Sequence, residues 1–309
     1  MNMLSISSYS LREHLGPNSI TFTDARGDEQ VFAQDFPMLV DITDFPRRAA
    51  QTYPVAGVEA VAFQFAGLDD PALDTFADHA TEAGLALLNV AVDVGDLVRP
   101  DADGLAGDVA ELKRWITRVA DLGFRFVRVN AGSPFSTHYG DVPPARLVAA
   151  LTELGGYATG RGIRLLVENH GGPSSDPVWM NALLDQVGET NLGLLLDLGN
   201  FDTLLDPLMA AMFAEPGAAP GDPFDGLDLT SLYDGIEALA DRAELVHVKA
   251  HVVADDGLVG PVDLPKALDI LTRHGYTGPL TIEYEGTGGD PWAHTGRVID
   301  VTATALAPR

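Results

Sequence analysis

Short aliphatic runs that end in polar residues alternate along the chain with longer segments rich in alanine and leucine. Such alternation is typical of parallel strands joined by crossover helices. Eight runs are predicted as strands: 4–8, 58–64, 86–93, 124–130, 163–170, 192–197, 245–251 and 280–285. Eight strand–helix units without a break in composition favour one closed (β/α)8 TIM barrel formed by residues 1–309. The alternatives are a doubly wound open sheet and a two-domain α/β protein divided near residue 155.

The segments between these runs carry helix signals. Helices are predicted over 70–83, 108–122, 144–160 and 264–274, each followed by glycine at or near its end. The second of them has an apolar stripe at helical spacing, which includes Leu112, Ile116 and Val119. Two gaps between strands are too long for one crossover helix. We therefore expect insertions at 16–37, after the first strand, and at 209–228, after the sixth.

Composition excludes several classes of protein. The 309 residues are 46% hydrophobic and 21% charged, which is a globular composition. With 45 acidic against 19 basic residues the net charge is −26, so we expect no nucleic-acid partner and no binding to anionic membranes. The chain has no cysteine, which excludes disulfides, zinc–thiolate sites, iron–sulfur clusters and thiol nucleophiles.

The chain offers no candidate membrane segment. Its longest apolar-rich stretch, 57–68, contains Glu59 and Gln64 and is shorter than the roughly 20 residues that a membrane-spanning helix needs. The opening residues MNMLSISSYSLREHL lack a basic segment followed by a long apolar run, so we expect no signal peptide. A cytoplasmic location is the resulting prediction.

Charged side chains gather where four consecutive predicted strands end. Inward-facing residues near the carboxyl ends of barrel strands line the pocket, and residues two apart share a face. The candidates are Glu168 and His170 in VENHGG, Asp197 at the end of LGLLLD, His247, Lys249 and His251 in LVHVKAH, and Glu283 and Glu285 in LTIEYEG. Buried unpaired charges cost several kcal/mol. A divalent cation would compensate them, because three carboxylates and one imidazole suit a hard or borderline metal. Alternatively, the carboxylates pair with Arg128, Lys249 or backbone groups.

Four motifs in chain order, VENHGG, LLDLGNF, VHVKAH and LTIEYEG, resemble the xylose-isomerase-like barrel superfamily and its sugar phosphate isomerase/epimerase group. The segments ISSYS and DFPRRAAQTYPVAGVEAVAF extend the resemblance over nearly the whole chain. The resemblance implies a site for one divalent ion, manganese or else Mg²⁺, Co²⁺ or Zn²⁺, held by Glu168, Asp197, His247 and Glu283. It also implies that Glu168 and Glu283 act as the acid/base pair next to the carbonyl group of a sugar.

The chain departs from the ketose epimerases of this group at three positions. Asn200 stands where they carry a histidine, Ser174 where they carry a substrate-binding glutamate, and Val253 where they carry an arginine. These differences leave the four implied ligands in place but do not support a specific ketose 3-epimerase assignment. The endonuclease branch of the superfamily needs three zinc ions and further histidines, and both Asn200 and the net charge argue against it.

Further polar residues near the predicted pocket are candidates for binding substrate: His170, Lys249, Arg128, Asn130, Asn200, Glu285 and His138. Arg128 has the alternative role of pairing with Glu168, and Lys249 that of balancing Glu285. Glu285 would replace Glu283 as a ligand if the register were displaced by two residues. His138 lies in the loop after the fourth strand, and His251 is interpreted either as a pocket residue or as a solvated loop histidine.

We therefore expect a metal-dependent isomerase or epimerase that acts on a sugar or a sugar-derived polyol. The alternatives are a metal-dependent lyase or dehydratase acting on an inosose, a keto-sugar or an oxidised glycoside, and a non-catalytic sugar-binding subunit. The lyase begins with the same deprotonation and then expels a leaving group. The expected partner is a small molecule, and the resemblance implies a homodimer or homotetramer.

Overall fold

Eight parallel strands form a closed barrel in the computed structural model of this chain, which describes residues 2–23, 29–132, 136–212 and 222–307. Around the barrel the order is β1, β12, β9, β8, β7, β6, β5, β4, and β4 pairs with β1 to complete the ring. The bounds are β1 (Leu4–Ser7), β4 (Gly57–Val61), β5 (Ala86–Val92), β6 (Phe126–Val129), β7 (Arg164–Glu168), β8 (Gly193–Asp197), β9 (Ala243–Ala250) and β12 (Leu280–Tyr284). Each strand overlaps one predicted run, so the predicted barrel is confirmed and the open sheet is excluded.

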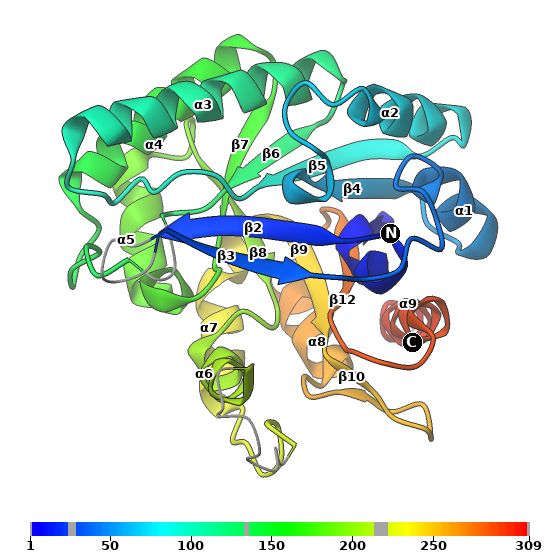
Figure 1. The fold of residues 1–309 in the computed structure, drawn as a ribbon. Helices are drawn as coiled ribbons and strands as arrows, with labels where there is room; N and C mark the ends of the chain where they lie inside the picture. Colours follow the sequence, from blue (N-terminus) through cyan, green and yellow to red (C-terminus); the bar gives the residue numbers. More distant parts are fainter. Residues whose placement is uncertain (1, 24–28, 133–135, 213–221, 308–309) are drawn as a thin grey trace.

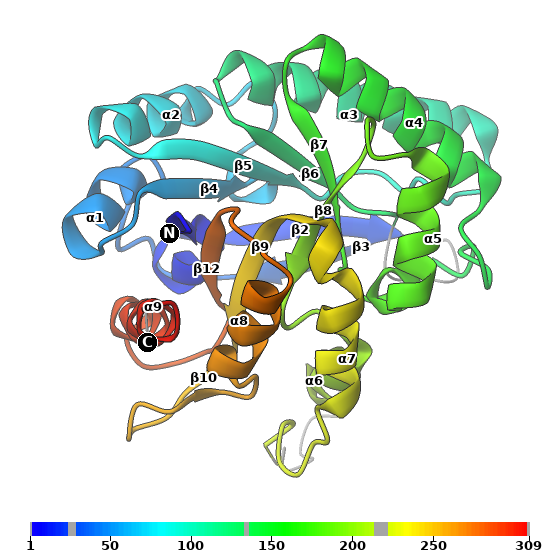
Figure 2. The same ribbon diagram turned by 180° about the vertical axis from the view of Figure 1, so that it is seen from behind.

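Helices surround the strands, as Figure 1 shows and as Figure 2 shows from the opposite side. They are α1 (Phe45–Thr52), α2 (Ala72–Glu82), α3 (Ala102–Asp121), α4 (Ala145–Gly160), α5 (Pro177–Val187), α6 (Asp202–Met212), α7 (Thr230–Leu239), α8 (Leu264–Arg273) and α9 (Pro291–Ala305). Short 3-10 helices are η1 (Ser8–His14), η2 (Ala62–Gln64), η3 (Gly172–Ser175) and η4 (Ala240–Arg242). The helices predicted over 70–83, 108–122, 144–160 and 264–274 correspond to α2, α3, α4 and α8.

The start of α3 differs from the prediction. The helix begins at Ala102 rather than at 108, because the side chain of Asp101 caps it by accepting a hydrogen bond from the backbone N–H of Gly104 (2.8 Å). The first residues of α3 are mostly exposed, so they carry no apolar stripe that would reveal the helix. Its later turns bury Leu112, Ile116 and Val119, as predicted.

An apolar floor closes part of the barrel interior below the strand ends. Phe126, Leu166, Leu195 and Leu245, from β6, β7, β8 and β9, form one buried cluster. Two positions further along each of these strands, on the same face, stand four of the predicted site residues: Arg128, Glu168, Asp197 and His247. The floor therefore sets both the depth and the inward direction of these charged side chains.

Two antiparallel pairs of strands outside the barrel interrupt the alternation of strands and helices. The hairpin of β2 (Asn18–Thr23) and β3 (Glu29–Gln34) lies within the predicted insertion 16–37, and β10 (Val252–Val253) pairs with β11 (Val259–Gly260) after β9. The hairpin passes in front of the barrel strands in Figure 1 and behind them in Figure 2, so it lies over one end of the barrel. It approaches η2, which directly follows β4, so this is the end where the strands finish. The second predicted insertion, 209–228, falls partly outside the described residues.

Among the described residues, none of the helices combines the length and the hydrophobicity that crossing a membrane requires.

Candidate functional site

Four side chains from neighbouring strands converge at the carboxyl end of the barrel. Glu168 and Asp197 are the last residues of β7 and β8, His247 lies in β9, and Glu283 lies in β12. We call these four residues the strand-end cluster; all of them are buried. One ligand atom each from Glu168, Asp197 and His247 lies within 4.8 Å of the others. The four residues that the family resemblance implies as metal ligands are therefore brought together.

His247 stands at the centre of this cluster. Its Nδ1 lies 3.5 Å from Glu168 Oε1, 3.6 Å from Asp197 Oδ2 and 3.3 Å from Glu283 Oε2. Its other ring nitrogen, Nε2, lies 3.1 Å from the carboxylate of Glu59. Nδ1 itself has no hydrogen-bond partner within the described part of the chain. One side of the ring thus faces three carboxylates and the other side faces a fourth.

Lys249 lies against the cluster and contacts three carboxylates. Its Nζ lies 3.0 Å from Asp197 Oδ2, 3.2 Å from Glu283 Oε2 and 2.8 Å from Glu285 Oε1. It also donates a hydrogen bond to Asn200 Oδ1 at 3.0 Å. The pairing of Lys249 with Glu285, considered as an alternative to substrate binding, is therefore present, together with contacts to two cluster carboxylates. A carboxylate oxygen has two lone pairs, so contact with Lys249 leaves room for a second partner.

Arg128 holds the opposite side of Glu168. Its Nε lies 2.8 Å from Glu168 Oε2, and its Nη1 forms an ion pair with Asp93 and donates to Asn130 Oδ1 at 2.9 Å. The amide of Asn130 in turn donates to Asp93 Oδ1 at 2.8 Å. Of the two roles considered for Arg128, the structure shows the pairing with Glu168, and Asn130 supports that pairing.

The charges in this site shift one another's ionisation. Burial alone would raise the pKa of Glu168, but the Arg128 guanidinium and the nearby histidines hold it well below its usual range. Burial also opposes ionisation of Glu283, yet His247 and Lys249 lower its pKa. For Asp197, burial prevails over the attraction of Lys249 and raises the pKa. The two glutamates are thus kept as anions by the cations beside them.

The cluster is compatible with a divalent metal ion. The carboxylates of Glu59, Asp93, Glu168, Asp197, Glu283 and Glu285 lie in or beside it, whereas the permanent cations that contact them, among the described residues, are Arg128 and Lys249. An excess of buried negative charge requires compensation. The unpartnered Nδ1 of His247 points to the place where three carboxylates converge, and oxygen ligands with one imidazole suit hard or borderline ions.

The remaining predicted substrate residues occupy different positions. Asn200 is buried, and its amide donates to Glu168 Oε1 at 3.2 Å. His170 is half-buried after β7, and its Nδ1 has no hydrogen-bond partner in the described ranges. His138 is exposed on the loop after β6, where its backbone carbonyl accepts a hydrogen bond from Arg146 at 3.0 Å. The structure therefore joins Asn200 to the cluster and does not join the imidazole of His138.

Two carboxylates of the site escaped the sequence analysis. Asp93 follows β5 and closes the predicted run 86–93, so its position at a strand end was an available signal. Glu59 stands inside the apolar run of β4, where it seemed only to interrupt a hydrophobic stretch. A charged residue in the middle of a barrel strand was the signal that could have identified it.

His251 is buried, which rules out the interpretation as a solvated loop histidine. It is 7% exposed, and its ring lies against Phe224 with ring centroids 5.4 Å apart. Burial lowers the pKa of His251 to about 4; the negative charge of Glu285 opposes this effect, and the positive charges of Lys249 and Arg12 add to it. The imidazole is therefore neutral near pH 7.

This neutral histidine predicts a loss of stability in acid. The unfolded chain binds a proton on His251 near pH 6.5, the folded chain only near pH 4, so stability declines as pH falls between these values. Between pH 7.5 and pH 5 the loss from this group is about 2 kcal/mol. Urea unfolding at both pH values is expected to show a smaller decline for His251→Gln than for the wild type. Equal declines would contradict the assignment.

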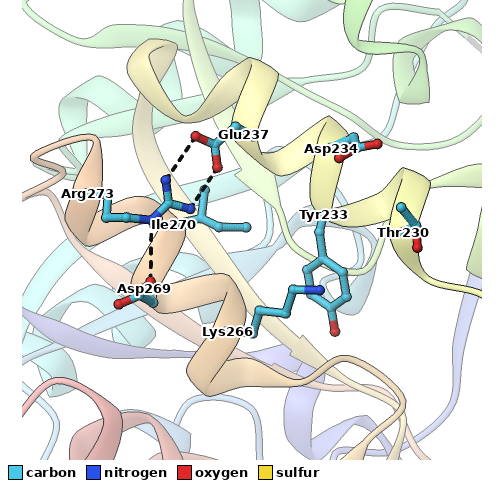
Figure 3. Close-up of a pocket in the computed structure, with 8 residues that line it drawn as sticks. All are labelled: Thr230, Tyr233, Asp234, Glu237, Lys266, Asp269, Ile270 and Arg273. Atoms are coloured by element: carbon cyan, nitrogen blue, oxygen red, sulfur yellow. Dashed lines mark hydrogen bonds and ion pairs between the residues drawn. The ribbon is translucent and has the colours of Figure 1, made fainter.

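A separate surface hollow lies between α7 and α8, outside the barrel (Figure 3). Arg273 there pairs with Glu237 at 2.8 Å and with Asp269 at 3.4 Å, and Lys266 Nζ lies 3.6 Å from the centre of the Tyr233 ring. The cations that line the hollow are thus engaged by neighbours at an exposed position.

Several solved structures share this architecture. A D-allulose 3-epimerase from Methylomonas sp. matches with a TM-score of 0.63 and 16% identity, covering 99% of this chain and 98% of that chain. An L-ribulose 3-epimerase matches with a TM-score of 0.64 and 17% identity, covering 99% and 96%. A 3-keto-D-glucoside 4-epimerase from E. coli matches with a TM-score of 0.60 and 13% identity, covering 85% and 93%.

No curated protein sequence matches the chain. At the identities above, the solved structures show the shared barrel fold. The resemblance inferred from the strand motifs is confirmed independently by a family model. Residues 48–302 match the model of the xylose isomerase-like TIM barrel, and the chain therefore belongs to this family.

Proposed function

We propose that this chain is a divalent-metal-dependent isomerase or epimerase of a sugar or a sugar-derived polyol. The observation that carries the proposal is the convergence of three carboxylates on Nδ1 of His247 at distances of 3.3 to 3.6 Å. The similar structures are sugar 3-epimerases and a 3-keto-D-glucoside 4-epimerase, and these enzymes support a sugar as the class of substrate.

Glu168, Asp197, His247 and Glu283 would hold the ion, with manganese as the first candidate and Mg²⁺, Co²⁺ or Zn²⁺ as the others. When bound, a divalent ion lowers the pKa of the C–H group between a carbonyl and an adjacent hydroxyl. Lys249 contacts Asp197 Oδ2 and Glu283 Oε2, the same oxygens that face Nδ1 of His247, and it also contacts Glu285 Oε1.

Proton transfer is assigned to Glu168 and Glu283. The two residues come from β7 and β12, which are separated in the ring by β8 and β9, so their carboxylates approach the site from different directions. Both have a lowered pKa, because the adjacent cations overcome the effect of burial, and both are therefore ionised and able to accept a proton. One carboxylate removes a proton from substrate carbon and becomes the protonated acid. The other glutamate, which must first take up a proton from solvent, gives that proton to the opposite face or to the neighbouring carbon and ends ionised.

The remaining polar residues are assigned to substrate binding. His170 is half-buried and its Nδ1 has no hydrogen-bond partner in the described part of the site, which supports assigning it to accept a hydrogen bond from a sugar hydroxyl. Glu168 is contacted by Asn200 and by Arg128, and Arg128 donates a hydrogen bond to Asn130. These three residues are therefore assigned an indirect role, through Glu168. Glu285 contacts Lys249 towards the mouth, and a role for His138 remains a prediction. A dimer or tetramer, a single domain and a cytoplasmic location also remain predictions.

Metal analysis of the purified protein is the first test. We expect about one divalent ion per chain by elemental analysis, and tight rebinding of one Mn²⁺ after chelator treatment. The loaded protein is then incubated with a panel of keto-sugars in deuterated water, where deuterium is expected to enter at the carbon next to the carbonyl group. A protein that neither retains nor rebinds any divalent ion would overturn the proposal.

Product mass separates the candidate reactions. An isomerase or epimerase gives a product of unchanged formula, whereas a dehydratase gives a product that lacks one water. A non-catalytic sugar-binding subunit binds the sugar without any exchange of its C–H protons for deuterium. We expect an unchanged formula together with deuterium incorporation, which only the isomerase or epimerase combines.

A further inference from the structure

Glu59 is a buried carboxylate that has no role in the proposed proton transfer. It lies in β4, is 2% exposed, and neighbours Ser7 of β1 and Asn89 of β5 in the sheet. It also reaches a distant strand, because Oε2 lies 3.1 Å from Nε2 of His247 in β9. Since β1 and β12 separate β4 from β9 around the ring, the side chain of Glu59 crosses the barrel interior to make this contact.

Donors from two further strands fix the carboxylate of Glu59. Asn89 Nδ2 donates to Oε2 at 2.8 Å, and the hydroxyl of Thr281, in β12, donates to Oε1. Ser5 of β1 reaches Thr281 in turn, with 2.6 Å between their hydroxyl oxygens. A buried carboxylate that accepts this many hydrogen bonds has one well-defined position. Glu59 therefore presents a fixed acceptor to the ring of His247.

The two nitrogens of His247 then have different roles. A carboxylate only accepts hydrogen bonds, so the contact with Glu59 requires a proton on Nε2. Nδ1 faces the carboxylates of Glu168, Asp197 and Glu283, which would otherwise attract the ring proton to that side. With one proton held at Nε2, an ion that displaces the proton from Nδ1 would meet the Nδ1 lone pair at the point where the three carboxylates converge.

We propose that Glu59 is a positioning residue that fixes the orientation and tautomer of His247 for binding a divalent ion. The inference rests on the proposed metal-dependent function and adds Glu59 to the four residues of the strand-end cluster. It follows the general rule that a ligating histidine donates its second N–H to a carboxylate or carbonyl, and that loss of this partner weakens metal binding about 10- to 100-fold. A purely structural role for Glu59 would instead change the stability of the metal-free protein and leave its affinity for metal unchanged.

Two substitutions of Glu59 distinguish the effect of the position of its carboxylate from the effect of its negative charge. Glu59→Asp retains the charge but shortens the side chain, so the carboxylate no longer reaches Nε2 of His247. Glu59→Gln retains the reach and an oxygen acceptor but removes the charge. Ser5→Ala is the matched control, because it removes a hydrogen bond from Thr281 in the same network and does not touch His247.

The measurement is calorimetric titration of the chelator-treated proteins with Mn²⁺. We expect the Kd to rise about 10-fold or more for Glu59→Asp, less for Glu59→Gln, and not at all for Ser5→Ala. The visible absorption band of the Co²⁺-loaded protein, which reports ligand geometry, is expected to change for Glu59→Asp and to stay the same for Ser5→Ala. Urea unfolding of the metal-free proteins shows that the variants are folded.

The outcomes distinguish the two proposals. If the wild type binds Mn²⁺ and both Glu59 variants bind it equally well with an unchanged Co²⁺ band, the positioning role is overturned and the proposed function stands. A weaker affinity for Glu59→Gln with a normal affinity for Glu59→Asp overturns it as well, since negative charge alone would then suffice. If the wild type binds no divalent ion, the proposed function fails and the role of Glu59 fails with it.

Discussion

Replacing Glu168 by glutamine is expected to lower kcat by about 10³-fold or more, because the variant has no carboxylate to accept the substrate proton. Arg128 Nε lies 2.8 Å from Oε2 of Glu168 as an ion pair, and the glutamine oxygen at the same place keeps this contact with the guanidinium. Asn200 donates to Oε1, so the glutamine NH₂ group would face another donor there. The variant therefore retains the guanidinium contact and loses the base.

Deuterium exchange makes this test sharper. If Glu168 and Glu283 act on opposite faces of the substrate, Glu168→Gln is expected to stop exchange from one epimer, and Glu283→Gln to stop exchange from the other. Glu13→Gln is a matched control near the strand ends, where Glu13 accepts a hydrogen bond from the backbone of Gly288 outside the cluster. Near-normal turnover in Glu168→Gln would remove Glu168 from the acid/base pair.

Replacing Asp197 by asparagine is expected to raise the Kd for Mn²⁺ by more than about 100-fold, which exceeds the usual effect of losing an outer partner. Oδ1 of Asp197 accepts hydrogen bonds from the backbone N–H groups of Gly199 (2.7 Å) and Asn200 (3.0 Å). These two donors require an oxygen at that position. The asparagine NH₂ group must therefore take the place of Oδ2, where it faces Nδ1 of His247 and the ammonium of Lys249.

Calorimetric titration of the chelator-treated protein with Mn²⁺ measures this effect. Glu285→Gln is the matched control, because Glu285 contacts Lys249 at 2.8 Å but lies outside the strand-end cluster, so its variant is expected to bind Mn²⁺ with nearly the wild-type Kd. Wild-type affinity in Asp197→Asn would show that Asp197 serves the packing of the loop after β8 and not the ion.

The barrel and its charged strand ends could be predicted because both depend on local periodicity. Glu168, Asp197 and His247 each stand two residues after a buried leucine of the floor, so alternation alone placed them on the inner face. The pairing of Arg128 with Glu168 was considered for the same reason. Strand order and helix packing then follow from the regular succession of units.

Contacts between distant parts of the chain could not be predicted from the sequence. Glu59 belongs to the site through its contacts with His247 and Thr281, which are 188 and 222 positions away in the sequence. No local pattern connects these residues. The ring of His251 lies against Phe224, which belongs to the predicted insertion 209–228. The early start of α3 depends on the cap by Asp101, which leaves no trace in the hydrophobic pattern.

The strand-end cluster occupies one uninterrupted arc of the ring, from β7 through β8 and β9 to β12. The loops that follow β1 and β4, together with the β2–β3 hairpin, belong to the opposite arc. Ser10, in the 3-10 helix η1 directly after β1, holds the backbone of β12 beside Glu283 through hydrogen bonds with Ile282 and Tyr284. Changes to the loops of the opposite arc that spare η1 are therefore expected to leave the proposed ligands in place. Grafting the β2–β3 hairpin or the loop after β4 from a relative accordingly tests whether these segments influence the choice of sugar.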